Sequence, residues 1–243
     1  MKEEILEFFR EHIDSIEGSG GSGSNFALPP FQLTARDFIA FAEADLEGQL
    51  NNHKLVNVTS NLKRAADCTL DYLMSVLHLD DFYRKKRLGV DRKLGFFKKA
   101  GIFNSRSLEK LNRIRNRLEH HYEIPDVKEV DVYFDLVVAF VALGEGFLPI
   151  IAGMSEIDLI LNDNGEEKYF GSKIDISNPS ICLELPSNGN SKEYSINLSN
   201  ISKSKAEDLD SFAYLLRVHI LLFHLYNGTT SSERFIQDLS KDF

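Results

Sequence analysis

Residues 113–122 have the sequence RIRNRLEHHY and lie near the end of a segment with the pattern of an α-helix. Ser105 is a suitable N-terminal cap, and the helix is predicted to run from about Arg106 to His121. Pro125 then stops or kinks it, because proline lacks the backbone N–H that a continuing helix needs. The mainly apolar residues 127–148 follow. The sequence therefore predicts two consecutive helices separated by a short break.

The residues before this pair also have helical patterns. Thr34 is a good N-cap for a helix from Ala35 to about Leu50, and apolar residues keep the helical period from Val56 to Leu79. A short basic helix is predicted at residues 94–100 and is closed by Gly101. Four principal helices with short connections favour an antiparallel bundle, which we expect in residues 25–153.

From about Met154 the pattern changes. Apolar and polar residues alternate over 157–161, as in a half-buried strand, and Asn164-Gly165 is a strong hairpin-turn signal. Further strands are predicted at 173–176, 181–185 and 194–198, followed by helices at 205–226 and 232–239. The predicted fold class is therefore mainly α, an antiparallel helical bundle in residues 25–153 followed by a smaller α+β region in residues 154–243.

The N-terminal residues are set apart by their composition. Residues 18–24 read GSGGSGS, which is typical of a flexible linker, either engineered or natural. Residues 1–17 form an amphipathic segment whose apolar stripe at helical spacing consists of Ile5, Phe8, Phe9, Ile13 and Ile16. A helix this short needs to dock its stripe on the main body to be stable. It is either a fused partner peptide or a relocated terminal helix of the same protein.

Charge is distributed unevenly along the chain. The 243 residues include 28 Lys and Arg against 37 Asp and Glu, and the net charge of −9 by itself argues against nucleic-acid binding. Residues 84–117, however, carry 13 cationic residues against Asp91 and Glu109, so this window is +11 and the remainder is −20. The cationic residues are Arg84, Lys85, Lys86, Arg87, Arg92, Lys93, Lys98, Lys99, Arg106, Lys110, Arg113, Arg115 and Arg117. Such a cluster either attracts a polyanion or forms a solvated helical face paired with acidic neighbours.

The cysteines, apolar stretches and histidines indicate the cellular compartment and the kinds of site to expect. Cys68 and Cys182 are too few for a disulfide framework or a paired-cysteine zinc site, which fits a cytoplasmic protein. The most apolar stretches are interrupted by charge or are too short for a membrane span, so we expect buried helices and no membrane. His219 and His224 lie on an apolar helix and are expected to be core residues. We expect no metal and no cofactor.

Within RIRNRLEHHY, the pair Arg115-Asn116 is followed after three residues by His120, with Tyr122 two places later. This arrangement resembles the signature of HEPN domains, a superfamily of helical ribonucleases and RNA-binding modules, and is similar to its toxin subfamily with Arg-x4-His-x-Tyr. The resemblance covers roughly residues 25–152. It implies a helical bundle that acts on RNA. Arg115 with His121, and Arg113 with His120, also satisfy a looser form of the pattern.

The chemistry that the resemblance implies is metal-independent RNA cleavage. His120 would take the proton from a ribose 2′-hydroxyl, Arg115 would hold the phosphate, and Asn116 would position the phosphate or the imidazole. In an ideal helix five residues turn about 500°, so Arg115 and His120 point about 140° apart. They converge on one phosphate only if the helix distorts or, as the resemblance implies, if a homodimer combines two copies of the motif.

RNA-binding roles are predicted for Tyr122, His121, Arg113, Arg117, Lys98 and Lys99. A structural alternative pairs Arg115 with an acid such as Glu119, places His120 at a helix C-terminus and packs Tyr122 under Pro125. The leading hypothesis is an HEPN-type endoribonuclease, a toxin or anti-phage defence effector with RNA as its partner. The alternative is a non-catalytic module that binds RNA or a peptide through the same surface.

Overall fold

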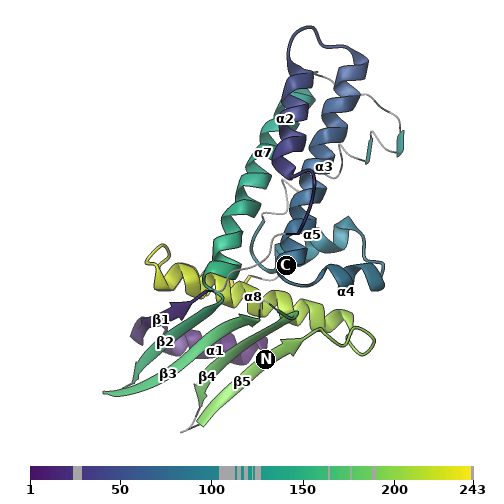
Figure 1. The fold of residues 1–243 in the computed structure, drawn as a ribbon. Coiled ribbons are helices and arrows are strands. Elements are labelled where there is room, and N and C mark those ends of the chain that lie inside the picture. The colour runs from purple at the N-terminus through teal and green to yellow at the C-terminus, as the bar shows by residue number, and fades with distance from the viewer. Residues whose placement is uncertain are drawn as a thin grey trace. The chain divides into compact units, whose positions relative to one another are not determined.

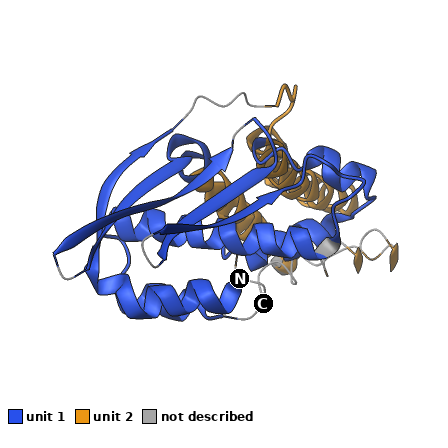
Figure 2. Ribbon diagram, turned by 90° about the horizontal axis from the view of Figure 1, so that it is seen from below, with its two compact units in different colours: residues 1–27, 76–102, 148–243 blue, residues 28–75, 103–147 orange. Residues whose placement is uncertain are grey.

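The computed structural model describes residues 1–23, 29–103, 113, 116–117, 120–121, 123, 127–163, 165–175, 177–187 and 190–241. The chain divides into two compact units, which are coloured separately in Figure 2. The α+β unit holds residues 1–27, 76–102 and 148–243, and the helical unit holds residues 28–75 and 103–147. Each unit is therefore assembled from segments that are distant in the sequence.

The α+β unit is built on a five-stranded antiparallel sheet in the order β1-β2-β3-β4-β5 (Figure 1). The strands are β1 (Ile16–Ser22), β2 (Glu156–Asp163), β3 (Glu166–Asp175), β4 (Ser180–Ser187) and β5 (Asn190–Asn197). Burial alternates along β2, where Ile157 and Leu159 are buried and Asp158 between them is exposed. Asp163 pairs with Glu166, so the hairpin expected at Asn164-Gly165 joins β2 to β3.

Helices cover the buried face of this sheet. α8 (Ala206–Tyr226) contacts β2, β3, β4 and β5, and its His219 hydrogen-bonds to Ser172 of β3. Phe170 lies two residues from Ser172, on the same face of β3, and its ring centroid is 5.7 Å from that of Phe8 in α1 (Lys2–His12). The unit also contains η1 (Ile13–Ser15), α4 (Asp80–Lys85), α5 (Val90–Lys99), the π-helix η2 (Pro149–Gly153) and α9 (Ser232–Leu239).

The N-terminal helix is an integral part of the α+β unit. Ile5 and Phe9 of α1 are completely buried, and the Phe9 ring lies 4.9 Å from that of Phe235 in α9. The hydroxyl of Tyr214 in α8 donates a hydrogen bond of 3.2 Å to the carbonyl oxygen of Lys2. The apolar stripe recognised in the sequence thus packs against α9 and the sheet.

The glycine- and serine-rich segment forms the edge strand β1, paired with β2 from Ile16 opposite Leu161 to Ser22 opposite Glu156. A side chain at Gly18 would place its Cβ 2.5 Å from the Tyr226 ring, and one at Gly21 would lie 2.5 Å from Cε of Met154. These glycines therefore permit close packing against α8 and the segment after η2. The structure shows an ordered strand over 16–22, where the sequence predicted a flexible linker over 18–24.

The helical unit is built from α2 (Ala35–Leu46), α3 (Asn52–Val76) and α7 (Val127–Leu148). Thr34 caps α2 as expected, because its hydroxyl accepts a hydrogen bond from the N–H of Asp37. Arg36 of α2 forms a two-pronged ion pair with Glu145 of α7. Among the described helices, Glu129–Gly153 is long and apolar enough to cross a membrane by length and composition alone, and 39% of its most apolar window is buried.

The prediction of a mainly α fold with a HEPN-like bundle is wrong. The structure is a mixed α+β arrangement organised around a five-stranded sheet. The N-terminal segment supplies α1 and β1 to this sheet unit. Residues 76–102, which were expected to be part of the bundle, belong to it as well and form α4, which was not predicted, and α5. The error arose because these segments depend on contacts with α8, α9 and β2, which are distant in the sequence.

Candidate functional site

Five of the predicted site residues lie in the helical unit and are described by the structure. Arg113, Asn116, Arg117, His120 and His121 are all helical, and all have exposed side chains. Arg115 and Tyr122 lie outside the described residues.

Arg113, Asn116 and His120 are each in helical conformation, and their spacing in the sequence is that of residues on one face of an ideal α-helix. Seven residues at 100° each turn about 700°, which is only about 20° short of two full turns, and Asn116 lies between them at three and four residues. At 1.5 Å per residue, an ideal helix would separate the first and the last of them by about 10 Å along its axis. These three residues, which we call the Arg113–Asn116–His120 stripe, would on such a helix bring a cation, an amide and an imidazole to one side, without the 140° separation that the same geometry gives Arg115 and His120.

Arg117 forms ion pairs with two glutamates that follow it in the sequence. Its Nε donates to Oε2 of Glu123 at 2.8 Å, and its Nη1 donates to Oε1 of Glu129 on α7 at 3.1 Å. The backbone N–H of Glu123 also donates to the carbonyl of Arg117 at 3.3 Å. The hydrogen bond from Arg117 holds the pKa of Glu123 below its usual value, and the charge of His121 adds to the effect. Arg117 thus ties the helix end to α7 and has two carboxylates matching its charge.

The other predicted RNA-binding residues, Lys98 and Lys99, lie on α5 of the α+β unit. Lys99 Nζ forms an ion pair of 2.6 Å with Asp210 of α8. The positive window of residues 84–117 is consequently divided. Eight of its cationic residues belong to the α+β unit, and the other five fall within residues 103–147 of the helical unit.

Both histidines of α8 were expected to be core residues, and only His219 is completely buried. Its Nε2 donates to the carbonyl of Met154 at 2.9 Å, so its Nδ1 accepts from the Ser172 hydroxyl at 2.9 Å. Burial lowers the pKa of His219 to about 4, which keeps the ring neutral at physiological pH. His224 is half-buried and bonds to Thr229.

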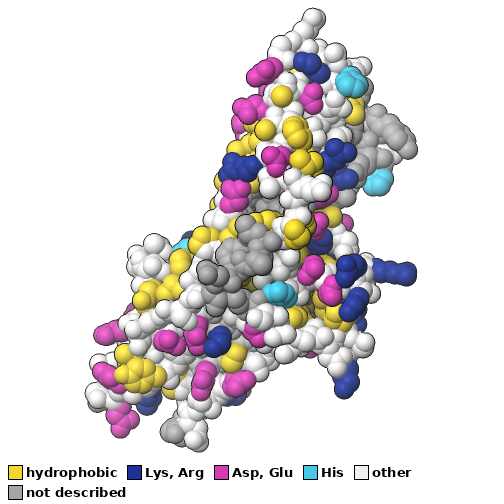
Figure 3. Space-filling model, in the orientation of Figure 1, with side chains coloured by type: hydrophobic (Ala, Val, Ile, Leu, Met, Phe, Trp, Pro, Cys, Tyr) yellow, Lys and Arg dark blue, Asp and Glu magenta, His cyan; other side chains and the backbone are white. Residues whose placement is uncertain are grey.

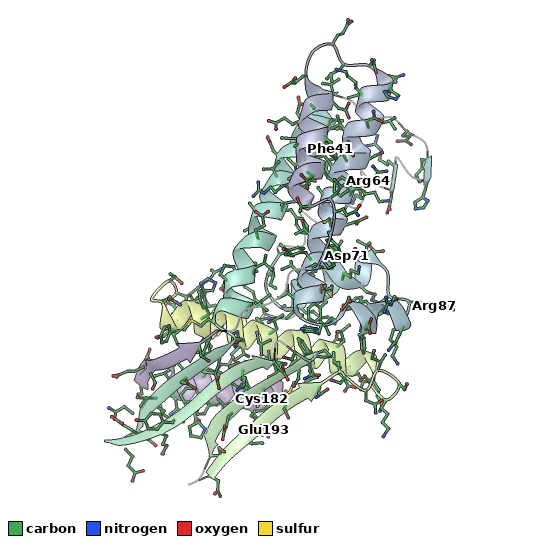
Figure 4. The ribbon with its side chains drawn as sticks, viewed as in Figure 1. Phe41, Arg64, Asp71, Arg87, Cys182 and Glu193 are labelled. Atoms are coloured by element: carbon green, nitrogen blue, oxygen red, sulfur yellow. The ribbon has the colours of Figure 1, made fainter. Side chains whose placement is uncertain are left out.

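In the described part of the chain, the cysteines and acidic groups form neither an activated nucleophile nor a set of metal ligands. Both cysteines are free, and burial together with Glu193 raises the pKa of Cys182 to about 11, so its thiol stays protonated at neutral pH (Figure 4). Within the described ranges, no group of three or more His, Cys, Asp or Glu side chains is arranged to hold a metal ion.

The comparisons with known proteins give no family: no family model, no curated protein and no solved structure matches this chain. Sequence reasoning missed one feature, the backbone conformation of Arg87 at the end of α4, which has φ of 52°. The sequence feature at this position is the run Arg84-Lys85-Lys86-Arg87 shortly before Gly89, which entered the prediction only through its positive charge.

Proposed function

We propose that the protein is a metal-independent endoribonuclease that uses the Arg113–Asn116–His120 stripe. The observation that carries the proposal is that these three side chains are exposed and their residues helical, at the spacing that an ideal helix places on one face. An imidazole next to an amide and a guanidinium is a combination suited to acid–base chemistry on a phosphate ester. The proposal does not depend on the bundle fold expected from the sequence.

In this mechanism the imidazole of His120 accepts the proton of a ribose 2′-hydroxyl. The 2′-oxygen attacks the adjacent phosphorus, the bond from phosphorus to the 5′-oxygen breaks, and a 2′,3′-cyclic phosphate forms. The leaving 5′-oxygen takes up a proton from a second copy's His120 in a homodimer. The Arg113 guanidinium stabilises the charge that develops on the phosphate oxygens, and the Asn116 amide orients the phosphate.

A second candidate is a module that binds RNA without cleaving it. The observation in its favour is the acidic surrounding of the stripe's C-terminal end, where Glu123 and Glu129 match the charge of Arg117. Negative charge next to the stripe opposes the build-up of further negative charge on a reacting phosphate. Binding without cleavage needs only the exposed donors of the stripe.

The test measures the cleavage rate of a labelled single-stranded RNA by the full chain in the presence of EDTA. His120→Ala is expected to lower the rate by about 10²- to 10⁴-fold, the usual size of a general-base contribution. Arg113→Ala and Asn116→Ala should lower it as well, and DNA of the same sequence should stay intact because it lacks the 2′-hydroxyl.

His53→Ala is the matched control, since His53 is an exposed histidine on α3 of the same unit. This variant should cleave at the wild-type rate. Loss of activity in His121→Ala and Arg115→Ala, with Arg113→Ala and His120→Ala unaffected, would contradict the stripe. It would assign the site to the alternative pair Arg115 and His121. RNA binding by the wild type without any cleavage would support the binding module instead.

A further inference from the structure

The helices α4 and α5 concentrate positive charge on one part of the α+β unit. Residues 84–99 contain eight Lys and Arg against a single acid, Asp91. Arg84 and Lys85 form ion pairs with Asp81, and Lys99 pairs with Asp210. In the part of the chain that the structure describes, Lys86, Arg87 and Arg92 are exposed and have no recorded ion pair. This part of the unit therefore keeps a net positive charge.

Arg87 has a backbone conformation that an arginine adopts only at a cost. It follows α4 with φ of 52°, in the left-handed region, and the N–H of Leu88 bonds back to the carbonyl of Tyr83 at 2.9 Å. This is the helix-ending position that glycine usually occupies, because a side chain there is strained. His78 has a similar φ of 54°, so the conformation alone assigns no role; Arg87 differs in being an exposed cation that directly follows Lys86. Figure 4 labels Arg87 at the end of α4.

Two hollows border this end of α4. One, of about 580 Å³, is lined by Lys85, Lys86 and the polar residues Ser199, Asn200 and Ser202. The other, of about 410 Å³, has four cations and two acids in its lining beside apolar residues of α4 and α5. The cations are Lys86, Arg92, Lys99 and Lys205, and the acids are Asp91 and Asp210, of which Asp210 is paired with Lys99. Lys86 lines both hollows. Cations that alternate with hydroxyl and amide donors match the phosphate and sugar oxygens of a nucleic-acid backbone.

Figure 3 shows Lys and Arg side chains gathered over α4 and its neighbourhood. The groove between α1 and the two hairpin ends of the sheet has the opposite character. It is about 820 Å³ in volume, and its lining has five acids, Glu4, Glu7, Glu11, Asp163 and Glu166, against two lysines. Lys168 pairs with Asp163 and Lys192 with Glu4, so the lining keeps a net negative charge. A polyanion is therefore attracted to the α4 end of this unit and repelled from the hairpin end.

We propose that the surface formed by Lys86, Arg87 and Arg92 together with residues 199–205 binds the sugar–phosphate backbone of single-stranded RNA. The choice of RNA rests on the proposed function, whereas the phosphate chemistry rests on this surface alone. Because phosphate contacts carry no sequence information, binding is expected to be independent of base sequence and strongly dependent on salt.

The test measures binding of a fluorescein-labelled 20-nucleotide single-stranded RNA by anisotropy, in a His120→Ala background so that the probe is not cleaved. The triple variant Lys86→Gln, Arg87→Gly, Arg92→Gln is expected to bind at least ten-fold more weakly at low salt. Its slope of log Kd against log salt should fall by about 2, since each phosphate contact on a single strand contributes about 0.7. DNA of the same sequence should bind within a few-fold of RNA.

Lys173→Gln, which removes one exposed cation from β3 of the same unit, is the matched control and should change Kd less than two-fold. Arg87→Gly alone should fold at least as stably as the wild type, because glycine relieves the strain, and should still bind more weakly. Arg87→Lys, which keeps the charge, should restore binding.

Weaker binding by the triple variant supports the surface whether or not the wild type cleaves RNA. Unchanged binding overturns it even if His120-dependent cleavage is observed. Equal weakening by Lys173→Gln, or binding to phosphatidylserine vesicles without any RNA binding, would overturn it as well.

Discussion

The α+β unit and the helical unit use histidine in opposite ways. In the α+β unit, His219 is completely buried, and both of its ring nitrogens are bonded, to Ser172 and to the carbonyl of Met154. In the helical unit, His120 is helical and exposed, four residues after the exposed Asn116. The first imidazole is held neutral and joins the sheet to α8, and the second is accessible to a substrate. Substitutions in the two units should therefore separate stability from activity.

The largest effect on stability is expected from the core of the α+β unit. Phe9→Ala removes a completely buried ring packed against Phe235, and such truncations cost about 3–5 kcal/mol of unfolding free energy. Urea denaturation followed by circular dichroism measures this loss. Hydrogen exchange should accelerate in α1, α9 and β3 before it changes in α2.

Phe8→Ala is the matched control, because Phe8 lies next to Phe9 on the same helix and is only half-buried. It should destabilise the protein clearly less than Phe9→Ala. Equal small losses for both variants would show that α1 is a dispensable attachment, and the account of the N-terminal segment as part of the fold would then fail.

The next effect is a pH dependence that belongs to the buried histidine. The folded pKa of His219 is about 4 against an ordinary value of 6.5, so the unfolded state binds more protons between these values. Its contribution is fully present above pH 6.5 and is lost as the pH falls toward 4. Between pH 7 and pH 5 the unfolding free energy should fall by roughly 2 kcal/mol. In His219→Gln this pH-dependent part should disappear, and a slope equal to that of the wild type would contradict the assignment.

A smaller effect is expected at the edge strand. In Gly18→Ala the new methyl group meets the Tyr226 ring, and overpacking of this kind costs about 1–3 kcal/mol. Gly20→Ala is the matched control, since the nearest atom to its Cβ is Asp158 Oδ2 at 3.8 Å. Thermal melts should therefore show a lower Tm for Gly18→Ala and an unchanged or higher one for Gly20→Ala. Equal tolerance of both substitutions would indicate a linker in place of the packed strand.

The smallest expected effect on stability is that of His120→Ala. An exposed helical residue away from the core usually changes the unfolding free energy by no more than about 0.5 kcal/mol. The midpoint of urea unfolding should match that of the wild type. A large destabilisation would mean that His120 has a structural role, and loss of activity in this variant could then not be assigned to chemistry.

Local patterns in the sequence were sufficient for many elements. Residues 127–148 and 232–239 were predicted as helices and are α7 and α9, and β2 and β3 on either side of Asn164-Gly165 pair as an antiparallel hairpin. The caps and the periodic apolar residues that specify these elements lie within them. The strand β1 was missed because glycine and serine have little strand propensity, and its glycines are required by Tyr226 and Met154, which are distant in the sequence.

The candidate site was predictable only in part. The residue types of the Arg113–Asn116–His120 stripe and their spacing were visible in the sequence. The ion pairs of Arg117 could not be predicted, because one of its carboxylate partners, Glu129, lies on α7, beyond the predicted break at Pro125. Likewise, the total charge of residues 84–117 could be counted, but its division between the two units depends on the tertiary fold.

The most direct test of the central claim is the chemistry of the ends that the protein leaves on single-stranded RNA in the presence of EDTA, identified by mass spectrometry. The account predicts 2′,3′-cyclic phosphate and 5′-hydroxyl ends from the wild type, none from His120→Ala, and no cleavage of RNA that carries 2′-O-methyl groups throughout. Ends with 3′-hydroxyl and 5′-phosphate groups, cleavage of the 2′-O-methyl RNA, or equal cleavage by His120→Ala would contradict it.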